Sequence, residues 1–237
     1  MLNKLSFALC ALSFSLIAEP VSTEQELAAL KAEVAQLKEI QRVMARTVGL
    51  GELVRPESLI IQGAELIGSE SAKYVLMEFT DLHCPYCAKY NTEVYPEIKQ
   101  TYVDKGELLY ASYDFPLLKL HPNAGYAALM KRCAGIQGKY SEAKDELFRS
   151  AAAFDEPYIK TFPVEMGLDV EKFDACLEDS ATHSKIASSI QYAEMLGFKS
   201  TPVFVLGLRK ENTVVDYKIV NGVLTVERLK ALMQELN

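Results

Sequence analysis

The sequence predicts an α/β domain, because strand patterns occur both before and after a long helical block. The helical block covers residues 121 to about 196. Short runs rich in β-branched, aromatic and other apolar residues, which are typical of strands, flank it on both sides. The order along the chain is β-α-β, the helical block, then β-β-α. The predicted strands are 74–80, 107–115, 201–206 and 214–220, and the other helices are about 87–103 and 225–236.

Residues 1–18 have the pattern of an export signal. Lys4 gives a positive start, residues 5–17 are apolar, and Ala18 is a small residue at a cleavage point, with cleavage after Ser15 as an alternative. The apolar stretch is shorter than the ~20 residues of a spanning helix, which argues against an uncleaved anchor. The pattern therefore predicts export.

Residues 19–48 are predicted to form a coiled coil. Apolar residues recur there at the spacing of a heptad seam, and acidic g positions and basic e positions can pair between parallel helices. We expect a homo-oligomer, a dimer or a trimer, joined through residues 27–48; the alternative is an amphipathic helix that packs on its own domain. The seam is Leu27, Leu30, Val34, Leu37, Gln41, Met44 and Val48, and the charges are Glu26, Glu33, Lys31 and Lys38.

A linker and one folded domain follow this helix. Gly49, Gly51 and Pro56 interrupt the helical pattern, so we expect a linker at residues 49–56 and a domain at 57–237. The net charge of −7 and the lack of a concentrated basic run argue against nucleic acid as a partner.

The first predicted strand, residues 74–80, is almost entirely apolar, which indicates burial on both faces. Glu78 interrupts it, and an unpaired buried charge is costly, so we expect the pKa of this carboxyl group to be raised. The alternative is a carboxylate at the sheet edge that faces water.

Cys84-Pro85-Tyr86-Cys87 follows, where this strand ends and a helix begins. Unpaired backbone N–H groups at a helix N-terminus stabilise a thiolate, so Cys84 is the expected nucleophile and Cys87 the buried resolving thiol. The alternatives are half of a zinc site and a static disulfide. Zinc ordinarily needs a second pair of ligands, and the sequence has no second C-x-x-C. We therefore expect a redox dithiol, with no metal and no cofactor.

These residues and the element order resemble the DsbA family of thioredoxin-fold oxidoreductases. The resemblance covers about residues 57–237 and implies a thioredoxin fold with a helical insertion at about 121–196, located in the periplasm. It also implies protein substrates with cysteines or disulfides, and a membrane redox partner. Beyond the C-x-x-C segment it rests on Glu78, Asp114-Phe115-Pro116-Leu117, His121-Pro122-Asn123-Ala124, Cys133-Ala134-Gly135, Gln137-Gly138-Lys139-Tyr140 and Ser200-Thr201-Pro202.

The resemblance assigns expected roles to several residues. Glu78 exchanges a proton with Cys87, and a cis Thr201-Pro202 bond leaves the Thr201 backbone free to pair with an extended substrate. An ordinary trans proline at a strand start is the alternative. Substrate contacts are expected at His83, Pro85, Tyr86, Thr201 and Pro202.

Three further expectations concern cysteines and histidines. Relatives with cysteines at the places of Cys133 and Cys176 join them in a structural disulfide; two buried free thiols are the alternative. His83 could stabilise the Cys84 thiolate as an imidazolium or be a solvated side chain. His121 and His183 are expected to be structural.

The expected function is that of a disulfide isomerase or reductase. The Pro85-Tyr86 pair differs from the Pro-His of the best-known oxidant in the family and resembles that of dimeric isomerases, and the predicted coil points the same way. The close alternative is a dithiol oxidase. From another class comes a copper-binding protein, because two soft thiolates can bind Cu(I).

Overall fold

The computed structural model describes residues 23–48 and 55–236, so the predicted signal segment and most of the predicted linker lie outside the described residues. The described part contains one six-stranded sheet in the order β1-β6-β5-β3-β4-β2. Strands β3 and β4 are parallel and all other neighbours are antiparallel. The strands are β1 (Ser58–Ile60), β2 (Glu65–Ile67), β3 (Tyr74–Thr80), β4 (Leu108–Asp114), β5 (Val203–Lys210) and β6 (Thr213–Asn221).

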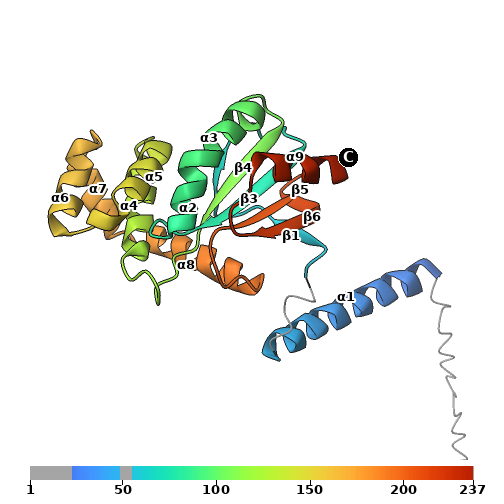
Figure 1. Ribbon diagram of the computed structural model, residues 1–237. Coiled ribbons are helices and arrows are strands. Elements are labelled where there is room, and N and C mark those ends of the chain that lie inside the picture. Colours follow the sequence, from blue (N-terminus) through green and yellow to red (C-terminus); the bar gives the residue numbers. More distant parts are fainter. Residues whose placement is uncertain (1–22, 49–54, 237) are drawn as a thin grey trace, which may run out of the picture.

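Helices cover both faces of this sheet (Figure 1). A continuous helical stretch, α2 (Pro85–Lys89), η2 (Tyr90–Val94), α3 (Tyr95–Ile98) and η3 (Lys99–Val103), packs on one face together with α9 (Val226–Glu235). The C-terminal half of α8 (Ser180–Met195) packs on the other face. Because successive side chains of a strand point to opposite faces, Glu78 and Leu76 share the face that α2 and α3 cover.

A helical insertion separates β4 from β5 and gathers at one end of the sheet (Figure 1). It has its own apolar core, which also contains Cys84 and Cys87, so the insertion and the start of α2 are packed together. The insertion consists of α4 (Ala124–Ile136), α5 (Tyr140–Arg149), η4 (Ala151–Ala153), α6 (Glu156–Glu165), α7 (Val170–Leu177) and α8.

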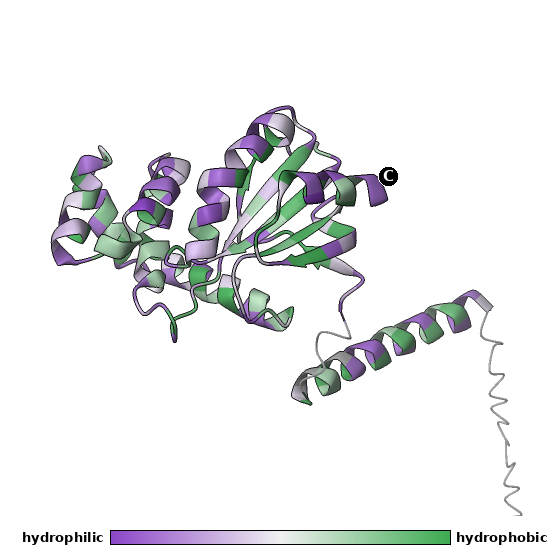
Figure 2. Ribbon diagram, in the orientation of Figure 1, coloured by the Kyte–Doolittle hydropathy of each residue, from purple (hydrophilic) through white to green (hydrophobic). Residues whose placement is uncertain are grey.

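The N-terminal helix α1 (Thr23–Thr47) stands apart from the domain (Figure 1). Apolar residues alternate with polar ones along it (Figure 2), and those of the predicted seam are exposed, with Leu37 at 58% and Met44 at 65%. Lys38 forms an ion pair with Glu57, just before β1. The apolar side of α1 is therefore not buried on its own domain, and its predicted self-association stays a prediction. No helix in the described ranges is long and apolar enough to span a bilayer.

Candidate active site

Cys84 is the N-cap residue of α2, the position at which an extended loop turns into a helix. Its backbone is extended (φ −81°, ψ 121°), and Pro85 occupies the start of the helix, where a missing N–H costs nothing. The backbone carbonyl of Asp81 accepts the N–H of Cys84 at 3.1 Å. Cys87 lies one turn further on and is fully buried. Both cysteines are free thiols, so the structure describes the dithiol state.

The two thiols have opposite acidities. The pKa of Cys84 falls from its ordinary 9.0 to about 5, mainly through a hydrogen bond from the Cys87 thiol, with Thr201 and the backbone N–H groups of Cys87 and Tyr86 adding to it while burial opposes it. Burial raises the pKa of Cys87, and the adjacent Cys84 raises it further. At neutral pH the pair is therefore a thiolate beside a protonated thiol.

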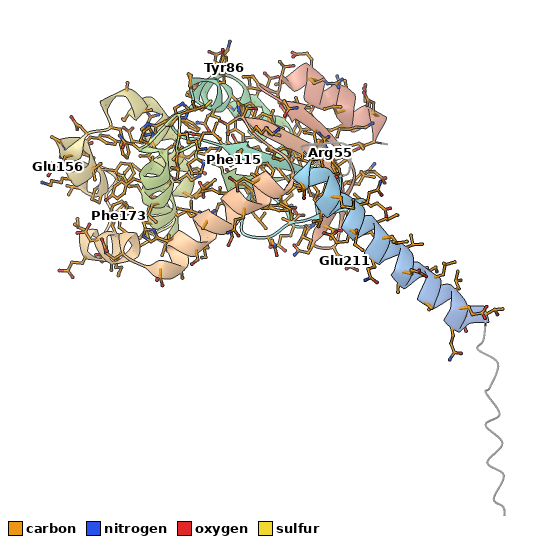
Figure 3. The ribbon with its side chains drawn as sticks, turned by 90° about the horizontal axis from the view of Figure 1, so that it is seen from below. Arg55, Tyr86, Phe115, Glu156, Phe173 and Glu211 are labelled. Atoms are coloured by element: carbon orange, nitrogen blue, oxygen red, sulfur yellow. A yellow bond between two sulfur atoms is a disulfide. The ribbon has the colours of Figure 1, made fainter. Side chains whose placement is uncertain are left out.

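Thr201 lies against Cys84, although the sequence separates the two by 117 positions. The Thr201–Pro202 peptide bond is cis, in agreement with the expectation from the resemblance. In the thiol form, Cys84 Sγ donates a hydrogen bond to the Thr201 carbonyl at 3.5 Å. The nearby Thr201 side chain also lowers the pKa of Cys84. Tyr86 projects outward from α2 (Figure 3) and is 64% exposed.

Glu78 is fully buried but not unpaired. Lys144 Nζ, from α5 of the insertion, lies 2.6 Å from Glu78 Oε2, and Ser112 Oγ donates to the same oxygen at 3.2 Å. The sequence indicates no partner for this charge, and the structure supplies one from a residue distant in sequence. Full burial on a central strand also excludes a carboxylate that faces water. The proton-exchange role of Glu78 stays a prediction.

Buried tyrosines surround this ion pair. The Lys144 ammonium lies 5.3 Å from the Tyr95 ring centre and 5.4 Å from that of Tyr110. Burial, followed by the negative charge of Glu78, raises the pKa of Tyr90, Tyr95 and Tyr110 well above the ordinary value, so all three stay neutral. Sequence reasoning missed Lys144, since nothing distinguishes it from a lysine on the exposed side of a helix.

His83 faces the insertion. Its ring meets that of Phe154 edge to face at 4.9 Å. Partial burial lowers the pKa of His83, and Asp81 only partly opposes this effect. The imidazole is therefore mainly neutral at neutral pH. The low pKa of Cys84 comes from the Cys87 thiol, Thr201 and the backbone N–H groups, and not from a charged His83.

Asp81 links the Cys84 loop to the loop after β4. Its Oδ1 accepts the backbone N–H of His83 at 2.8 Å, and its Oδ2 accepts that of Leu117 at 2.8 Å. The His121 Nδ1 lies 2.8 Å from the same Oδ2. Sequence reasoning gave Asp81 no role and treated His121 as structural. The structure places both in the support of the active-site loop.

Cys133 of α4 and Cys176 of α7 form a disulfide, with their Cα atoms 5.6 Å apart. It joins two insertion helices that also pack together. Among the residues that the structure describes, no group of three or more His, Cys, Asp or Glu side chains is placed to hold a metal ion. A copper site at this dithiol would therefore have to be built on Cys84 and Cys87 without a third such ligand.

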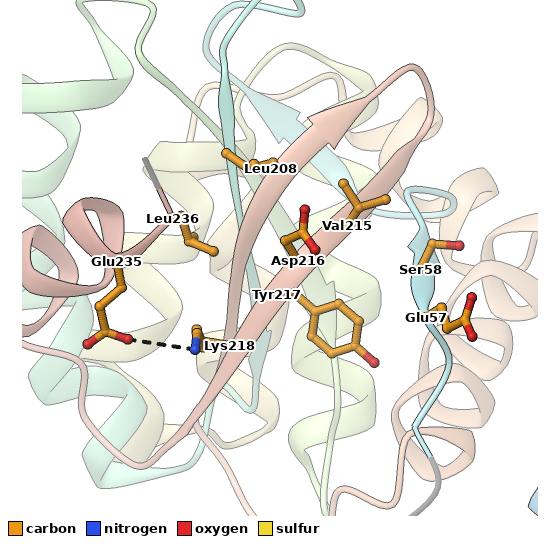
Figure 4. A pocket seen from close by; sticks show the side chains of 9 residues that line it. All are labelled: Glu57, Ser58, Leu208, Val215, Asp216, Tyr217, Lys218, Glu235 and Leu236. Atoms are coloured by element: carbon orange, nitrogen blue, oxygen red, sulfur yellow. Dashed lines mark ion pairs between the residues drawn. The ribbon is translucent and has the colours of Figure 1, made fainter.

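A separate hollow of about 990 Å³ lies beside β6 and α9 (Figure 4). Asp216, Tyr217 and Lys218 line it, and Lys218 Nζ lies 3.7 Å from Glu235 Oε2. None of the predicted site residues borders this hollow. The dithiol and its surroundings therefore stay the candidate active site.

A sheet in this order, with a dithiol at a helix N-terminus and a cis-proline opposite it, defines a thioredoxin fold. The chain belongs to the thioredoxin family, whose model matches residues 62–233. Among solved structures it is similar to α-DsbA1 of Wolbachia pipientis, at 23% identity and a TM-score of 0.65, over 78% of this chain and 94% of that one. It is also similar to DsbA2 of Pseudomonas aeruginosa, at 24% identity and a TM-score of 0.58, over 73% and 93% of the two chains.

These likenesses confirm the predicted thioredoxin fold with a helical insertion. Among curated proteins, the chain is 32% identical over 148 residues to the Na(+)/H(+) antiporter NhaA 1 of Mycolicibacterium vanbaalenii, covering 60% of this chain and 23% of that protein. The chain spans about a quarter of the length of the curated relatives it matches.

Proposed function

We propose that this protein is a thiol:disulfide oxidoreductase that acts on cysteines or disulfides of other proteins through Cys84 and Cys87. The observation that carries the proposal is the geometry of the dithiol, in which Cys84 caps α2 with its sulfur against the Thr201 carbonyl and Cys87 lies buried one turn further on. Cys84 is the stronger acid, with a pKa of about 5, and Cys87 is protonated and buried. Thiolates are the attacking species in disulfide exchange, and thiols of low pKa leave fastest.

The reaction starts when the Cys84 thiolate attacks one sulfur of a substrate disulfide. The substrate S–S bond breaks, the second substrate sulfur leaves as a thiolate, and Cys84 is joined to the substrate in a mixed disulfide. In isomerisation, another substrate thiolate attacks the mixed disulfide and regenerates Cys84. In reduction, Cys87 loses its proton and attacks Cys84, so the substrate leaves reduced and the Cys84–Cys87 disulfide forms.

Glu78 and Thr201 are proposed to assist these steps. Glu78 lies on the sheet face that α2 covers and accepts the proton that Cys87 loses, as a carboxylate compensated by Lys144. Thr201 pairs with the backbone of an extended substrate next to its reactive cysteine. Pro85, Tyr86 and Pro202 are proposed to contact the same segment, and His83 to border it as a neutral side chain.

Isomerase or reductase action is the form of this activity that we favour, because of α1. Its exposed apolar seam supports a homo-oligomer, a dimer or trimer, formed through residues 27–48. Several catalytic domains on one stalk can hold a substrate through repeated exchanges. This proposal includes a signal at 1–18, export to the periplasm, a coil at 19–48, a linker at 49–56, a catalytic domain at 57–237 and a membrane redox partner.

A dithiol oxidase is the second candidate, and the acidity of Cys84 favours it. A pKa of about 5 stabilises the reduced protein as a thiolate, which makes the Cys84–Cys87 disulfide a stronger oxidant. The equilibrium of the dithiol with glutathione separates the two candidates. A potential of about −120 mV would indicate an oxidant and one of about −270 mV a reductant.

Substitution of each cysteine tests the shared chemistry. Cys84→Ser should abolish exchange with a protein disulfide, and Cys87→Ser should accumulate the mixed disulfide, which mass spectrometry detects. Exchange that survives Cys84→Ser would overturn the proposed function.

A further inference from the structure

An apolar groove lies along α8, on the sheet face opposite α2. Its hollow of about 660 Å³ falls in the size range of ligand sites. A second hollow of about 250 Å³ shares Pro116, Leu118 and Ile190 with it and continues along α8 towards Tyr126 and His183. The α8 groove, as we call the two hollows together, is walled by the loop after β4 and the start of α4 on one side and by α8 and the residues after it on the other.

Both walls of the α8 groove are connected to the loops around Cys84. In the first wall, the backbone N–H of Phe115 donates to the Thr80 carbonyl at 2.7 Å, and that of Leu117 donates to Asp81, whose carbonyl accepts the Cys84 N–H. The second wall ends at Lys199, two residues before Thr201, which contacts Cys84 Sγ. The walls of the groove are therefore connected to the loops that carry Cys84 and Thr201, and the groove begins a few residues from the dithiol.

The composition of the groove differs from that of the protein surface as a whole. Leu118 and Leu120 are 51% and 71% exposed in the same loop, and exposed apolar patches of this kind mark interaction sites. Lys119, Lys199 and Glu194 are its charged residues, so the groove is positive although the whole chain has a net charge of −7. None of the three has an ion-pair partner within the described ranges.

We propose that the α8 groove binds an extended segment of the protein substrate on one side of its reactive cysteine. The segment is apolar, with an acidic side chain near Lys119 and Lys199. This inference rests on the proposed function, because it continues the path of a substrate paired with Thr201. Unfolded or misfolded chains expose such apolar segments, whereas folded proteins bury them. The groove thus selects substrates by the residues beside the cysteine.

The experiment compares two double variants with similar losses of exposed apolar surface. Leu118→Ser/Leu120→Ser removes two apolar side chains that line the groove. Ile136→Ser/Val164→Ser is the control, since these two residues are 68% and 66% exposed and do not line the groove. The substrates are disulfide-linked peptides with leucines, with serines, or with leucines and one aspartate beside the cysteine. A small aromatic disulfide measures the chemistry without the groove.

The groove variant should lower kcat/KM for the leucine peptide about tenfold, as expected for the loss of a few buried methylenes, and leave the small disulfide and the serine peptide unchanged. The control variant should match the parent on every substrate. Lys119→Glu/Lys199→Glu should remove any advantage of the aspartate peptide. Equal rates for leucine and serine peptides with the parent, or equal losses in the groove and control variants, would overturn the proposal.

Binding without chemistry separates this inference from the proposed function. Fluorescence anisotropy of a labelled leucine peptide with Cys84→Ser/Cys87→Ser protein reports the groove alone, and the two leucine replacements should weaken this binding by a similar factor. If the small disulfide is not turned over by the parent but the peptide binds in this way, the catalytic proposal fails and the groove stands. If the peptide binds equally well without Leu118 and Leu120, the groove proposal fails.

Discussion

Replacing Lys144 by methionine removes the cation beside Glu78 and keeps an unbranched side chain in the same buried space. The parent pair is 2.6 Å apart, with the two side chains 3% and 0% exposed. Breaking such a pair by removing one partner costs about 3–5 kcal/mol, because the remaining charge is buried without compensation. The variant can escape part of this cost if Glu78 takes up a proton.

Proton uptake makes the loss of stability depend on pH. Protonating an ordinary glutamate, whose pKa is near 4.3, costs about 3.7 kcal/mol at pH 7 and about 1 kcal/mol at pH 5. The native Lys144→Met protein then binds more protons than its unfolded chain, so it loses stability relative to the parent as pH rises through this interval. Urea denaturation of the oxidised parent and variant measures the difference in their free energies of unfolding at pH 5 and at pH 7.

Lys131→Met is the matched control. Lys131 is also a fully buried lysine of the insertion, 2.6 Å from Asp114, but Arg132 remains paired with that carboxylate when the lysine is removed. We expect a loss of stability that changes little between pH 5 and pH 7. Combining Lys144→Met with Glu78→Gln should recover much of the loss, because no buried charge is left uncompensated.

Lys144→Met should also slow one chemical step. A protonated Glu78 cannot accept the proton of Cys87, so the mixed disulfide of Lys144→Met should persist longer at pH 7, while the first attack by Cys84 keeps its rate. Rapid acid quenching and mass spectrometry follow both species. A stability difference independent of pH, or an unchanged lifetime of the mixed disulfide, would refute the proposal that Lys144 compensates the Glu78 carboxylate.

Four further outcomes are expected. The rate of alkylation of Cys84 in the reduced protein should be constant between pH 8 and pH 6 and fall by half near pH 5, and a rate that titrates near pH 9 would contradict this. For the same reason, the free energy of unfolding of the reduced form should rise relative to that of the oxidised form as pH rises from about 5 to about 9. Thr201→Val should move that titration to higher pH, whereas Thr213→Val, on β6, should not. Cys133 and Cys176 should stay unlabelled under mild reduction that opens Cys84–Cys87, as mass spectrometry of alkylated protein would show; labelling of Cys133 would count against a stable bridge. Deleting residues 21–48, or replacing Leu30 and Leu37 by Asp, should give a monomer by light scattering that reduces a small disulfide at the parent rate but reshuffles a scrambled protein poorly; an oligomer, or undiminished reshuffling, would remove the support for an isomerase.

Sequence patterns predicted the elements whose burial is strong and continuous. The apolar run at residues 74–80 matches β3, because a strand buried on both faces needs apolar residues at nearly every position. The two edge strands β1 and β2 were missed, since each has three residues and too few positions to form a pattern. The helix expected at about 87–103 is divided into α and π turns around Pro96, whose ring nitrogen has no hydrogen to donate.

The site was predictable where neighbouring residues define it. Cys84 and Cys87 are close in sequence and lie at a strand-to-helix junction, so their chemistry can be read locally. The Glu78–Lys144 pair joins residues 66 positions apart on a strand and an inserted helix, and Asp81 with His121 joins two loops. Such contacts depend on how the insertion docks, which periodicity does not reveal.

The lysine that compensates Glu78 has a consequence for any attempt to reduce this protein to a minimal thioredoxin. Trimming the insertion back to a short connection between β4 and β5 would remove α5, leaving a negative charge in the middle of a central strand. A neutral residue at position 78 would restore the stability lost by trimming, but the protein would then lack the carboxylate proposed to serve Cys87. Size reduction and catalysis are thus in conflict here, and a catalytically competent miniature must retain α5 or rebuild its cation elsewhere.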